Sequence, residues 1–278
     1  MGHLTGPRVD APRSGPEEKI LTPPFLPMKL PLPSLLLLSA LALAGRLAAA
    51  ETQPLRALLI TGGCCHDYTF QAKALTAATE KLGPIAWTVV HEGGTTKNAK
   101  IKLYDDPSWA KPYDVVVHNE CFADLADPDY TRKITNAHKG GTPAVVIHCA
   151  MHTYRTLAVD DWREFLGVTS RHHDHQARYP VNPTAAAKNH PAMRGFPDQW
   201  ITPMDELYII EKTWPKTTAL ATSVSEKDGK TYPAIWTNDY YGTRVFGTTY
   251  GHGNATWHDP VFLTLVARGV RWAAGRDN

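Results

Sequence analysis

Histidine, cysteine, asparagine and glutamate side chains gather at four points where a predicted strand ends. The groups are Cys64-Cys65-His66, His118-Asn119-Glu120-Cys121, His148-Cys149 with His152, and Gly251-His252. Such side chains can transfer protons, attack carbonyl carbons or bind metal ions. In an open parallel sheet, ligands bind beyond the carboxyl ends of the strands. We therefore expect a working site at one edge of a sheet, where these groups meet.

The first half of the chain alternates between apolar runs and helical patterns. Strands are expected at residues 55–61, 87–91, 113–118 and 143–148, with helices at residues 67–82 and 127–139. Continuous β-branched runs of this kind are typical of strands buried on both faces. The alternation predicts one α/β domain with a flavodoxin-like parallel sheet flanked by helices.

The second half is more mixed. Strands are expected at residues 207–210, 218–223, 232–236 and 244–250, with a hairpin turn at Asp228-Gly229. A short helix is expected at residues 162–166 and a closing helix at residues 260–274, whereas residues 170–189 are interpreted as polar loop.

Residues 28–50 have the layout of a secretory signal peptide. Met28-Lys29 precedes a leucine-rich run, and Ala48-Ala49-Ala50 resembles a cleavage site. The apolar run is short for a membrane span, so we expect no stable membrane insertion after cleavage. Residues 1–27 lack periodicity and are interpreted as a spurious or disordered extension. The mature domain is then residues 51–278, exported and expected in a periplasm.

The charge of the mature part is balanced. The whole chain holds 29 Lys and Arg and 27 Asp and Glu. The first 50 residues hold 5 and 3 of these, so residues 51–278 carry 24 of each sign. A balanced domain gives nucleic acid and anionic membranes no electrostatic attraction, so neither is expected as a partner. No nucleotide cofactor is expected either.

Two interpretations of the four cysteines stay open. In an oxidising compartment, Cys64 or Cys65 could form a disulfide with Cys121, because the first and third strands are neighbours in a flavodoxin-like sheet. Alternatively, these thiolates could bind a soft metal ion.

Several segments together resemble the ThuA-like family, which is named for trehalose utilisation. They are His66-Asp67, the strand ending at His148, His190-Pro191, Asp205-Glu206-Leu207-Tyr208, Gly242 to Phe246, Gly251-His252, and Trp257 through Asp259, Pro260 and Phe262 to Arg268-Gly269 and Trp272. Their order covers nearly the whole mature chain. The resemblance implies the fold of class I glutamine amidotransferases and a link to sugar metabolism, with a small-molecule carbohydrate as partner.

A cysteine nucleophile is the first of three mechanisms. Cys149 and His252 hold places comparable to the catalytic cysteine and histidine of the amidotransferase-like fold. However, the sharp turn that carries such a nucleophile usually has small residues two positions away, and here these positions are Ile147 and Met151. Asn254 replaces the acid that follows the histidine. A glutaminase is therefore not expected, although a hydrolase that depends on Cys149 stays open.

A metal-assisted mechanism is the second. His148, His173, His175 and His252 could bind a divalent, zinc-like ion and leave one position for water or a sugar oxygen. Their spacing is not that of a fixed motif.

Acid–base chemistry on a sugar or keto-sugar without metal is the third mechanism, and the chain is expected to be a carbohydrate-active hydrolase, lyase or isomerase. The expected catalytic residues are His66, His148, His252, Glu120 and Cys149. The expected substrate-binding residues are Asp67, Tyr68, Asn119, His152, Asp205, Glu206, Tyr208 and Trp257. The alternative from another class is a sugar-binding module without catalysis.

Overall fold

The structure is a computed structural model that describes residue 2 and residues 53–277. The predicted signal peptide at residues 28–50 and nearly all of the predicted extension at residues 1–27 lie outside these residues. Within the described ranges, no helix combines the length and the apolarity needed to cross a membrane.

A mixed sheet runs through the described part of the chain. Its nine strands lie in the order β2-β1-β3-β4-β11-β10-β9-β6-β7. Their bounds are β1 Leu55–Gly63, β2 Ile85–His91, β3 Val115–Cys121, β4 Ala144–Ile147, β6 Pro180–Pro183, β7 Trp200–Ile201, β9 Thr217–Val224, β10 Thr231–Tyr240 and β11 Thr243–Thr248. The first five strands in spatial order pair in parallel, and the remaining pairs are antiparallel. The expected α/β fold with a largely parallel sheet is confirmed.

Aspartate side chains fix where three of the helices begin. Asp67, Asp127 and Asp259 each accept a backbone N–H of the first turn of the helix that follows. The α-helices are α2 Tyr68–Thr79, α3 Pro128–Lys139, α4 Asp161–Leu166 and α5 Pro260–Ala273. The short 3-10 turns are η1 Glu80–Leu82, η2 Lys102–Asp105, η3 His148–Met151, η4 Ala185–Ala187, η5 Pro191–Met193 and η6 Thr256–His258.

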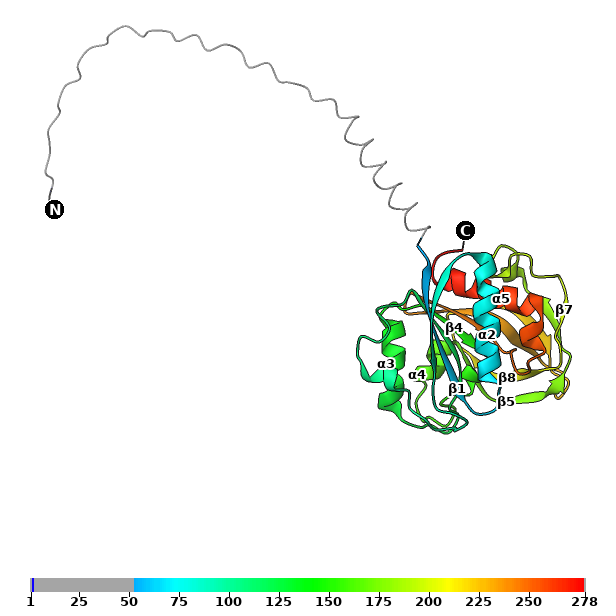
Figure 1. Ribbon diagram of the computed structural model, residues 1–278, viewed down its shortest axis with the longest axis horizontal. Helices are drawn as coiled ribbons and strands as arrows, with labels where there is room; N and C mark the ends of the chain where they lie inside the picture. Colours follow the sequence, from blue (N-terminus) through cyan, green and yellow to red (C-terminus); the bar gives the residue numbers. More distant parts are fainter. Residues whose placement is uncertain (1, 3–52, 278) are drawn as a thin grey trace, which may run out of the picture. The chain divides into compact units, whose positions relative to one another are not determined.

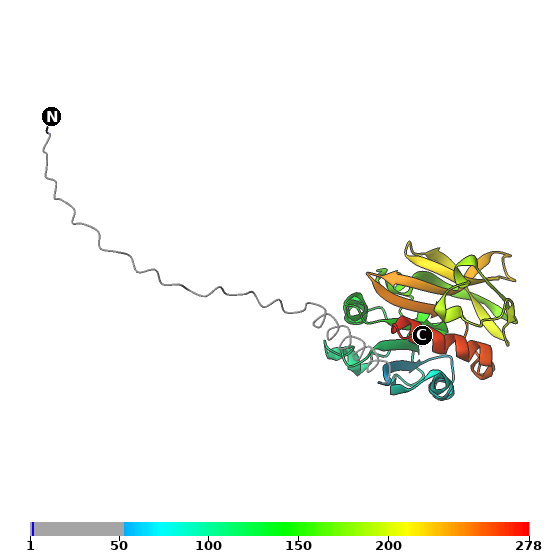
Figure 2. The same ribbon diagram turned by 90° about the horizontal axis from the view of Figure 1, so that it is seen from above.

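Helices cover both faces of the sheet. Phe246 on β11 lies directly beneath Gly269 of α5, where any side chain would collide with its ring. The next residue, Gly247, lies against the Trp236 ring, whose indole donates to the carbonyl of Leu166 at the end of α4. Successive residues of a strand point to opposite faces, so α4 and α5 cover opposite faces. Figures 1 and 2 show α2 beside α5 on one of them.

A separate two-stranded ribbon corrects the sequence-based prediction. β5 (Val168–Ala177) pairs in antiparallel fashion with β8 (Asp205–Thr213) and with no other strand. Residues 170–189 were expected to be loop, which is wrong for most of β5 and for β6. Much of β5 is exposed, so backbone pairing rather than apolar alternation holds it in place. Figure 1 shows the ribbon at the end of the sheet where β1 terminates.

Candidate functional site

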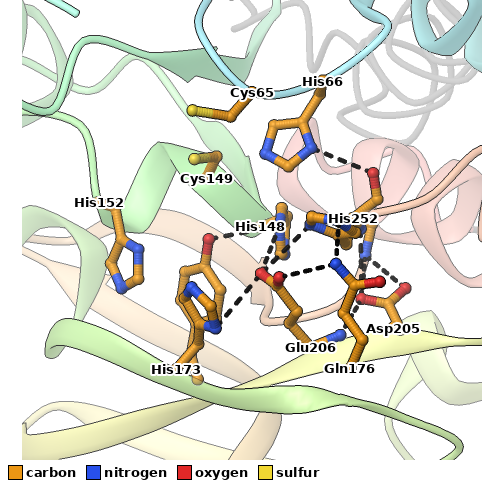
Figure 3. A network of polar contacts seen from close by, with 12 residues as sticks. Cys65, His66, His148, Cys149, His152, His173, Gln176, Asp205, Glu206 and His252 are labelled. Atoms are coloured by element: carbon orange, nitrogen blue, oxygen red, sulfur yellow. Dashed lines mark hydrogen bonds and ion pairs between the residues drawn. The ribbon is translucent and has the colours of Figure 1, made fainter.

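A cavity of about 250 Å³ lies where β1, β3, β4 and β11 end and the ribbon begins. It is lined by Cys64, Cys65, His66, Lys97, Cys121, Ala123, Cys149, His152, Arg155, His173, Glu206, Tyr208 and His252. The lining therefore joins strand-end residues with residues of β5 and β8 (Figure 3). Its size suits a ligand smaller than the drug-sized molecules that fill pockets of roughly 300–1,000 Å³.

Three histidines from separate strand ends meet at this cavity. The ring of His66 lies 4.8 Å from that of His148 and 4.9 Å from that of His252, measured between centroids. The His148 and His252 rings are 5.5 Å apart. The predicted convergence of the strand ends thus holds for all three imidazoles, which Figure 3 shows facing one another.

The turn after β4 carries a histidine at its strained position. His148 has φ of 46°, in the left-handed region that residues with a side chain seldom adopt. A sharp strand-to-helix turn of this type presents a nucleophile in other α/β enzymes. Here it presents the His148 imidazole, and Cys149 is one residue further on. Strain retained at such a position is a common mark of a functional site.

A buried carboxylate holds the turn that carries His252. Asp205 accepts the backbone N–H of Gly251 at 3.1 Å and that of His252 at 3.2 Å. The hydroxyl of Thr256 also donates to it. Burial raises the pKa of Asp205 to about 6, although these hydrogen bonds oppose the rise. Asp205 therefore positions His252 from behind, and it does not line the cavity.

The Glu206 carboxylate lies among the imidazoles. Its Oε2 atom is 3.2 Å from Nδ1 of His252, 3.6 Å from Nδ1 of His173 and 3.8 Å from Nε2 of His148. Burial acts to raise the pKa of Glu206, but its interactions with His252 and His173 outweigh burial and hold that pKa below its usual value. The same carboxylate raises the pKa of His252. The pair can therefore hold a carboxylate beside a protonated imidazole.

The other buried imidazoles are held neutral. Burial, with His252 nearby, lowers the pKa of His66 to about 4. Burial also lowers the pKa of His148 well below its usual value and that of His152 to about 3. His152 stacks on the ring of Tyr208 at 3.9 Å, and the Tyr208 hydroxyl lies 3.3 Å from Nε2 of His148. Near neutral pH these rings supply lone pairs rather than charge.

All four cysteines are paired, in a pattern that differs from the expected one. Cys64 bonds to Cys65 and Cys121 bonds to Cys149. The expected bond from Cys64 or Cys65 to Cys121 is absent, although the Cys64 and Cys121 sulfur atoms lie 3.8 Å apart. Cys149, on the turn after β4, is close enough to take Cys121 as its partner. In this oxidised form Cys149 lines the cavity but offers no free thiol.

Glu120 and Asn119 lie on opposite sides of β3, and neither lines the cavity. Glu120 is completely buried, and one of its oxygens lies 2.9 Å from Nδ1 of His118. Asn119 donates to the side chain of Gln71, which in turn donates to the carbonyl of Gly251. The polar end of β3 was taken as a loop following the strand, but it continues the strand into the core. Glu120 is therefore remote from the chemistry, and Asn119 supports the His252 turn.

Three further predicted residues have supporting roles. Asp67 caps α2 and accepts from Asn254 at 3.2 Å. Trp257 is buried and donates to the carbonyl of Gly251 at 2.8 Å. Tyr68 is buried next to the cysteines, and its hydroxyl has no hydrogen-bond partner among the described residues. None of the three lines the cavity wall, so direct substrate contact by them is not supported.

His173 and His175, two of the four histidines that were expected as metal ligands, both lie on β5 but have different surroundings. His173 lines the cavity, with its Nδ1 2.7 Å from the carbonyl of Asp174. His175 is exposed, and its two ring nitrogens face Asp174 and Glu226 instead. The imidazoles of His173 and His175 therefore do not form one ligand set with those of His148 and His252.

Gln176, Lys97 and Arg155 belong to the site but were not foreseen. The Gln176 side-chain nitrogen lies 2.9 Å from Nε2 of His252 and 3.4 Å from Glu206 (Figure 3). Lys97 and Arg155 place cations on the cavity wall. Gln176 lies on the strand mistaken for a loop, and the two cations are in segments without any motif, so no sequence signal marked them.

Two groups of side chains have the spacing of a metal site. His66, His148 and His252 each offer one ring nitrogen, and these nitrogens lie within 4.8 Å of one another. The sulfurs of Cys64, Cys65 and Cys121 meet the same limit, but they are engaged in disulfides.

Residues 56–273 match the ThuA family, which is described as trehalose utilisation. No curated protein matches the chain. A ThuA-like protein from Parabacteroides merdae shares 23% identity, with a TM-score of 0.62 over 80% of this chain and 90% of that one. Another from Bacteroides uniformis shares 15% identity, with a TM-score of 0.59 over 79% and 91%. These two structures support the fold alone.

Proposed function

This chain belongs to the ThuA family, the family of trehalose utilisation, and on that premise we propose that it is an enzyme acting on a sugar or keto-sugar derivative. The proposed site is the cavity beside Glu206. The observation that carries the proposal is the placement of this carboxylate against His148, His173 and His252.

The cavity wall favours a ligand rich in hydroxyl groups. It presents the cations Lys97 and Arg155, the imidazoles of His152 and His173, and the ring of Tyr208. Few purely apolar side chains line it. Hydroxyl and carbonyl oxygens can accept from such donors, whereas an apolar ligand would leave them unpaired at a cost.

Glu206 and His252 suit proton transfer next to a keto group. Glu206 takes the proton from the carbon beside the carbonyl, and the electron pair left behind forms the enolate. The protonated imidazole of His252 then gives its proton to the enolate oxygen. In an isomerisation, Glu206 returns its proton to the former carbonyl carbon while the neighbouring hydroxyl gives its proton to His252 and becomes the new carbonyl. In an elimination, the enol hydroxyl returns its proton to His252 and the carbonyl reforms, while the oxygen substituent of the next carbon leaves with the proton that Glu206 holds. A positioned acid and base typically contribute factors of roughly 10² to 10⁴ in rate.

We also propose that the protein is exported. Residues 28–50 support this, because they have the layout of a signal peptide. The pairing of all four cysteines suits an oxidising compartment. Cell fractionation and N-terminal sequencing test the idea, and a cytoplasmic protein with an intact residue 28–50 segment would contradict it.

The enzymatic proposal is tested with oxidised and unoxidised glucosides and disaccharides, followed by NMR. We expect turnover of a keto-sugar by the wild-type protein and a fall of roughly 100-fold or more in kcat for Glu206→Gln. KM should change little, because the amide keeps the shape of the carboxylate. The matched control is Glu226→Gln, since Glu226 is exposed and its carboxylate pairs with the exposed His175.

Binding without turnover would favour the sugar-binding module instead. In that case calorimetry would detect a sugar that the wild-type protein binds and leaves unchanged, and His252→Ala would weaken the binding. A hydrolase that depends on Cys149 would require reduction of the bond to Cys121. Loss of activity on alkylation after reduction would reveal it.

A further inference from the structure

Two of the strand-end histidines, His66 and His148, share one pattern of hydrogen bonds. Nδ1 of His66 lies 3.1 Å from the carbonyl oxygen of His252, and Nδ1 of His148 lies 2.6 Å from that of Thr249. A carbonyl oxygen only accepts, so each Nδ1 carries the proton and each Nε2 keeps a lone pair. Both rings are thus fixed in the tautomer that presents Nε2 as a donor of electrons.

His252 has a carboxylate beside its Nδ1 instead of a hydrogen-bonded carbonyl. Its Nδ1 faces Oε2 of Glu206 at 3.2 Å, and its Nε2 lies 2.9 Å from the side-chain amide of Gln176. Histidines that bind metal ions almost always donate their second ring N–H to a carbonyl or carboxylate, which orients the ring and raises its basicity. His66 and His148 therefore already have the outer partner that a metal ligand requires, and His252 has a carboxylate 3.2 Å from its Nδ1.

The three rings also converge, with His148 buried and His66 and His252 partly exposed. One nitrogen from each of His66, His148 and His252 lies within 4.8 Å of the others. The turn that holds His252 is fixed by Asp205, and the strained turn that holds His148 is fixed between β4 and η3. A site built on rigid strand ends costs little reorganisation when an ion binds.

We propose that His66, His148 and His252 bind one divalent transition-metal ion, with zinc-like preferences, and leave a coordination position open to the cavity. Three imidazole ligands suit zinc, cobalt or copper rather than magnesium or calcium, and the Glu206 carboxylate lies beside them, with Oε2 3.8 Å from Nε2 of His148. Three protein ligands with a free position are typical of catalytic rather than structural zinc sites.

This inference deepens the proposed function and rests on it for the choice of substrate. The open position would take a sugar oxygen, so that the ion polarises the carbonyl beside which a proton is removed. With the ion bound, His252 would be a neutral ligand, so the ion rather than a protonated imidazole would offset the charge on the enolate oxygen, and Glu206 would stay the base. The ligand set differs from the one expected from the sequence, because His66 replaces His173 and His175.

The test is metal binding by the unreduced full-length protein, in which the cysteines are held in disulfides and offer no thiolates. After dialysis against a chelator, the protein is titrated with Co²⁺ and the visible absorption is followed, with elemental analysis to count ions. We expect one ion per chain with the intense bands of a four-coordinate site. His66→Gln and His148→Gln should each weaken binding by about 100-fold or more.

His175→Gln is the matched control, because this histidine lies on the ribbon outside the cluster and should leave the titration unchanged. Circular dichroism of each variant checks that the fold is retained. Equal affinity in wild type, His66→Gln and His148→Gln would overturn the proposal, as would the absence of stoichiometric binding to the wild type.

The two proposals can fail separately. Stoichiometric binding without turnover of any keto-sugar leaves the metal site standing and removes the enzymatic proposal. Turnover of a keto-sugar by wild-type protein that binds no stoichiometric Co²⁺ in the titration does the reverse.

Discussion

Asp205 shows how a residue outside the cavity decides the geometry within it. Its carboxylate accepts the two consecutive backbone N–H groups of Gly251 and His252, and Thr256 donates to it as well. Glu206, the next residue, is thereby placed opposite the imidazole that Asp205 orients from behind. Two adjacent acids thus have different roles, since Asp205 holds the backbone and Glu206 faces the cavity.

Asp205→Asn tests this division. The amide keeps the shape of the side chain but turns an N–H group toward backbone donors that need an acceptor. We expect a loss of about 2 kcal/mol in the free energy of unfolding, measured by urea denaturation. Asp198→Asn is the control, because Asp198 is exposed, and it should change stability little. Equal stability of the two variants would show that the hydrogen bonds accepted by Asp205 contribute little to stability.

The segment between β11 and α5 sets the position of His252, which lines the cavity. Gly251 has φ of 131°, and a Cβ there would lie 3.1 Å from Cγ2 of Ile147 and 3.3 Å from Cβ of His148. The end of β11 can therefore approach the end of β4 only with glycine at this point. That close approach brings the His148 and His252 rings together.

Gly251→Ala should separate these strand ends. The strained φ and the tight contacts predict a destabilisation of about 1–3 kcal/mol. Thermal unfolding measures it, and any activity or metal binding should fall as His252 moves. Gly253→Ala is the matched control, since its Cβ would meet its nearest neighbour at 3.5 Å, an ordinary contact. A Gly251→Ala protein as stable as Gly253→Ala would contradict the close-packing argument.

At the scale of helices and strands, the sequence predicts the elements whose apolar pattern follows from burial, and it fails for the elements whose residues are exposed. The buried strands β1, β3 and β4 and the Asp-capped helices follow from apolar runs and capping residues. The ribbon strand β5 carries His173 and Gln176 on an exposed, polar backbone, so nothing distinguishes it from a loop. Glu120 was expected in the site because the strand was predicted to end at residue 118, whereas β3 continues through its polar residues to Cys121.

The whole molecule buries several histidines in neutral form. Burial lowers the pKa of His138 and of His152 to about 3, and that of His66 to about 4. His138 is completely buried, with His118 3.0 Å from its Nε2 and the carbonyl of Thr142 2.7 Å from its Nδ1. These side chains take up protons readily only when the chain unfolds. The folded state should therefore lose stability as the pH falls below the ordinary histidine value.

His138→Asn tests how much one of these buried histidines contributes to the pH dependence of stability. The folded pKa is about 3, below the unfolded value near 6.5, so the unfolded state binds one more proton between these limits. The wild-type free energy of unfolding should fall more steeply than that of the variant, by about 1.4 kcal/mol per pH unit between about pH 6 and 4. Urea denaturation at several pH values measures the slopes. His172→Asn, at an exposed histidine, should keep the wild-type slope, and a wild-type slope in His138→Asn would refute the assignment.

The β5–β8 ribbon has a consequence for how such a protein diversifies. The imidazoles of His66, His148 and His252 come from segments that follow strands of the nine-stranded sheet, whereas His173 and Gln176 come from a strand that pairs only with β8. Substitutions in β5 can therefore reshape the cavity wall while the segments that carry the three imidazoles keep their sequence. Changes in this one short strand can alter which ligands the cavity accepts, and a library randomised over residues 171–176 would let an engineer select for such changes in the laboratory.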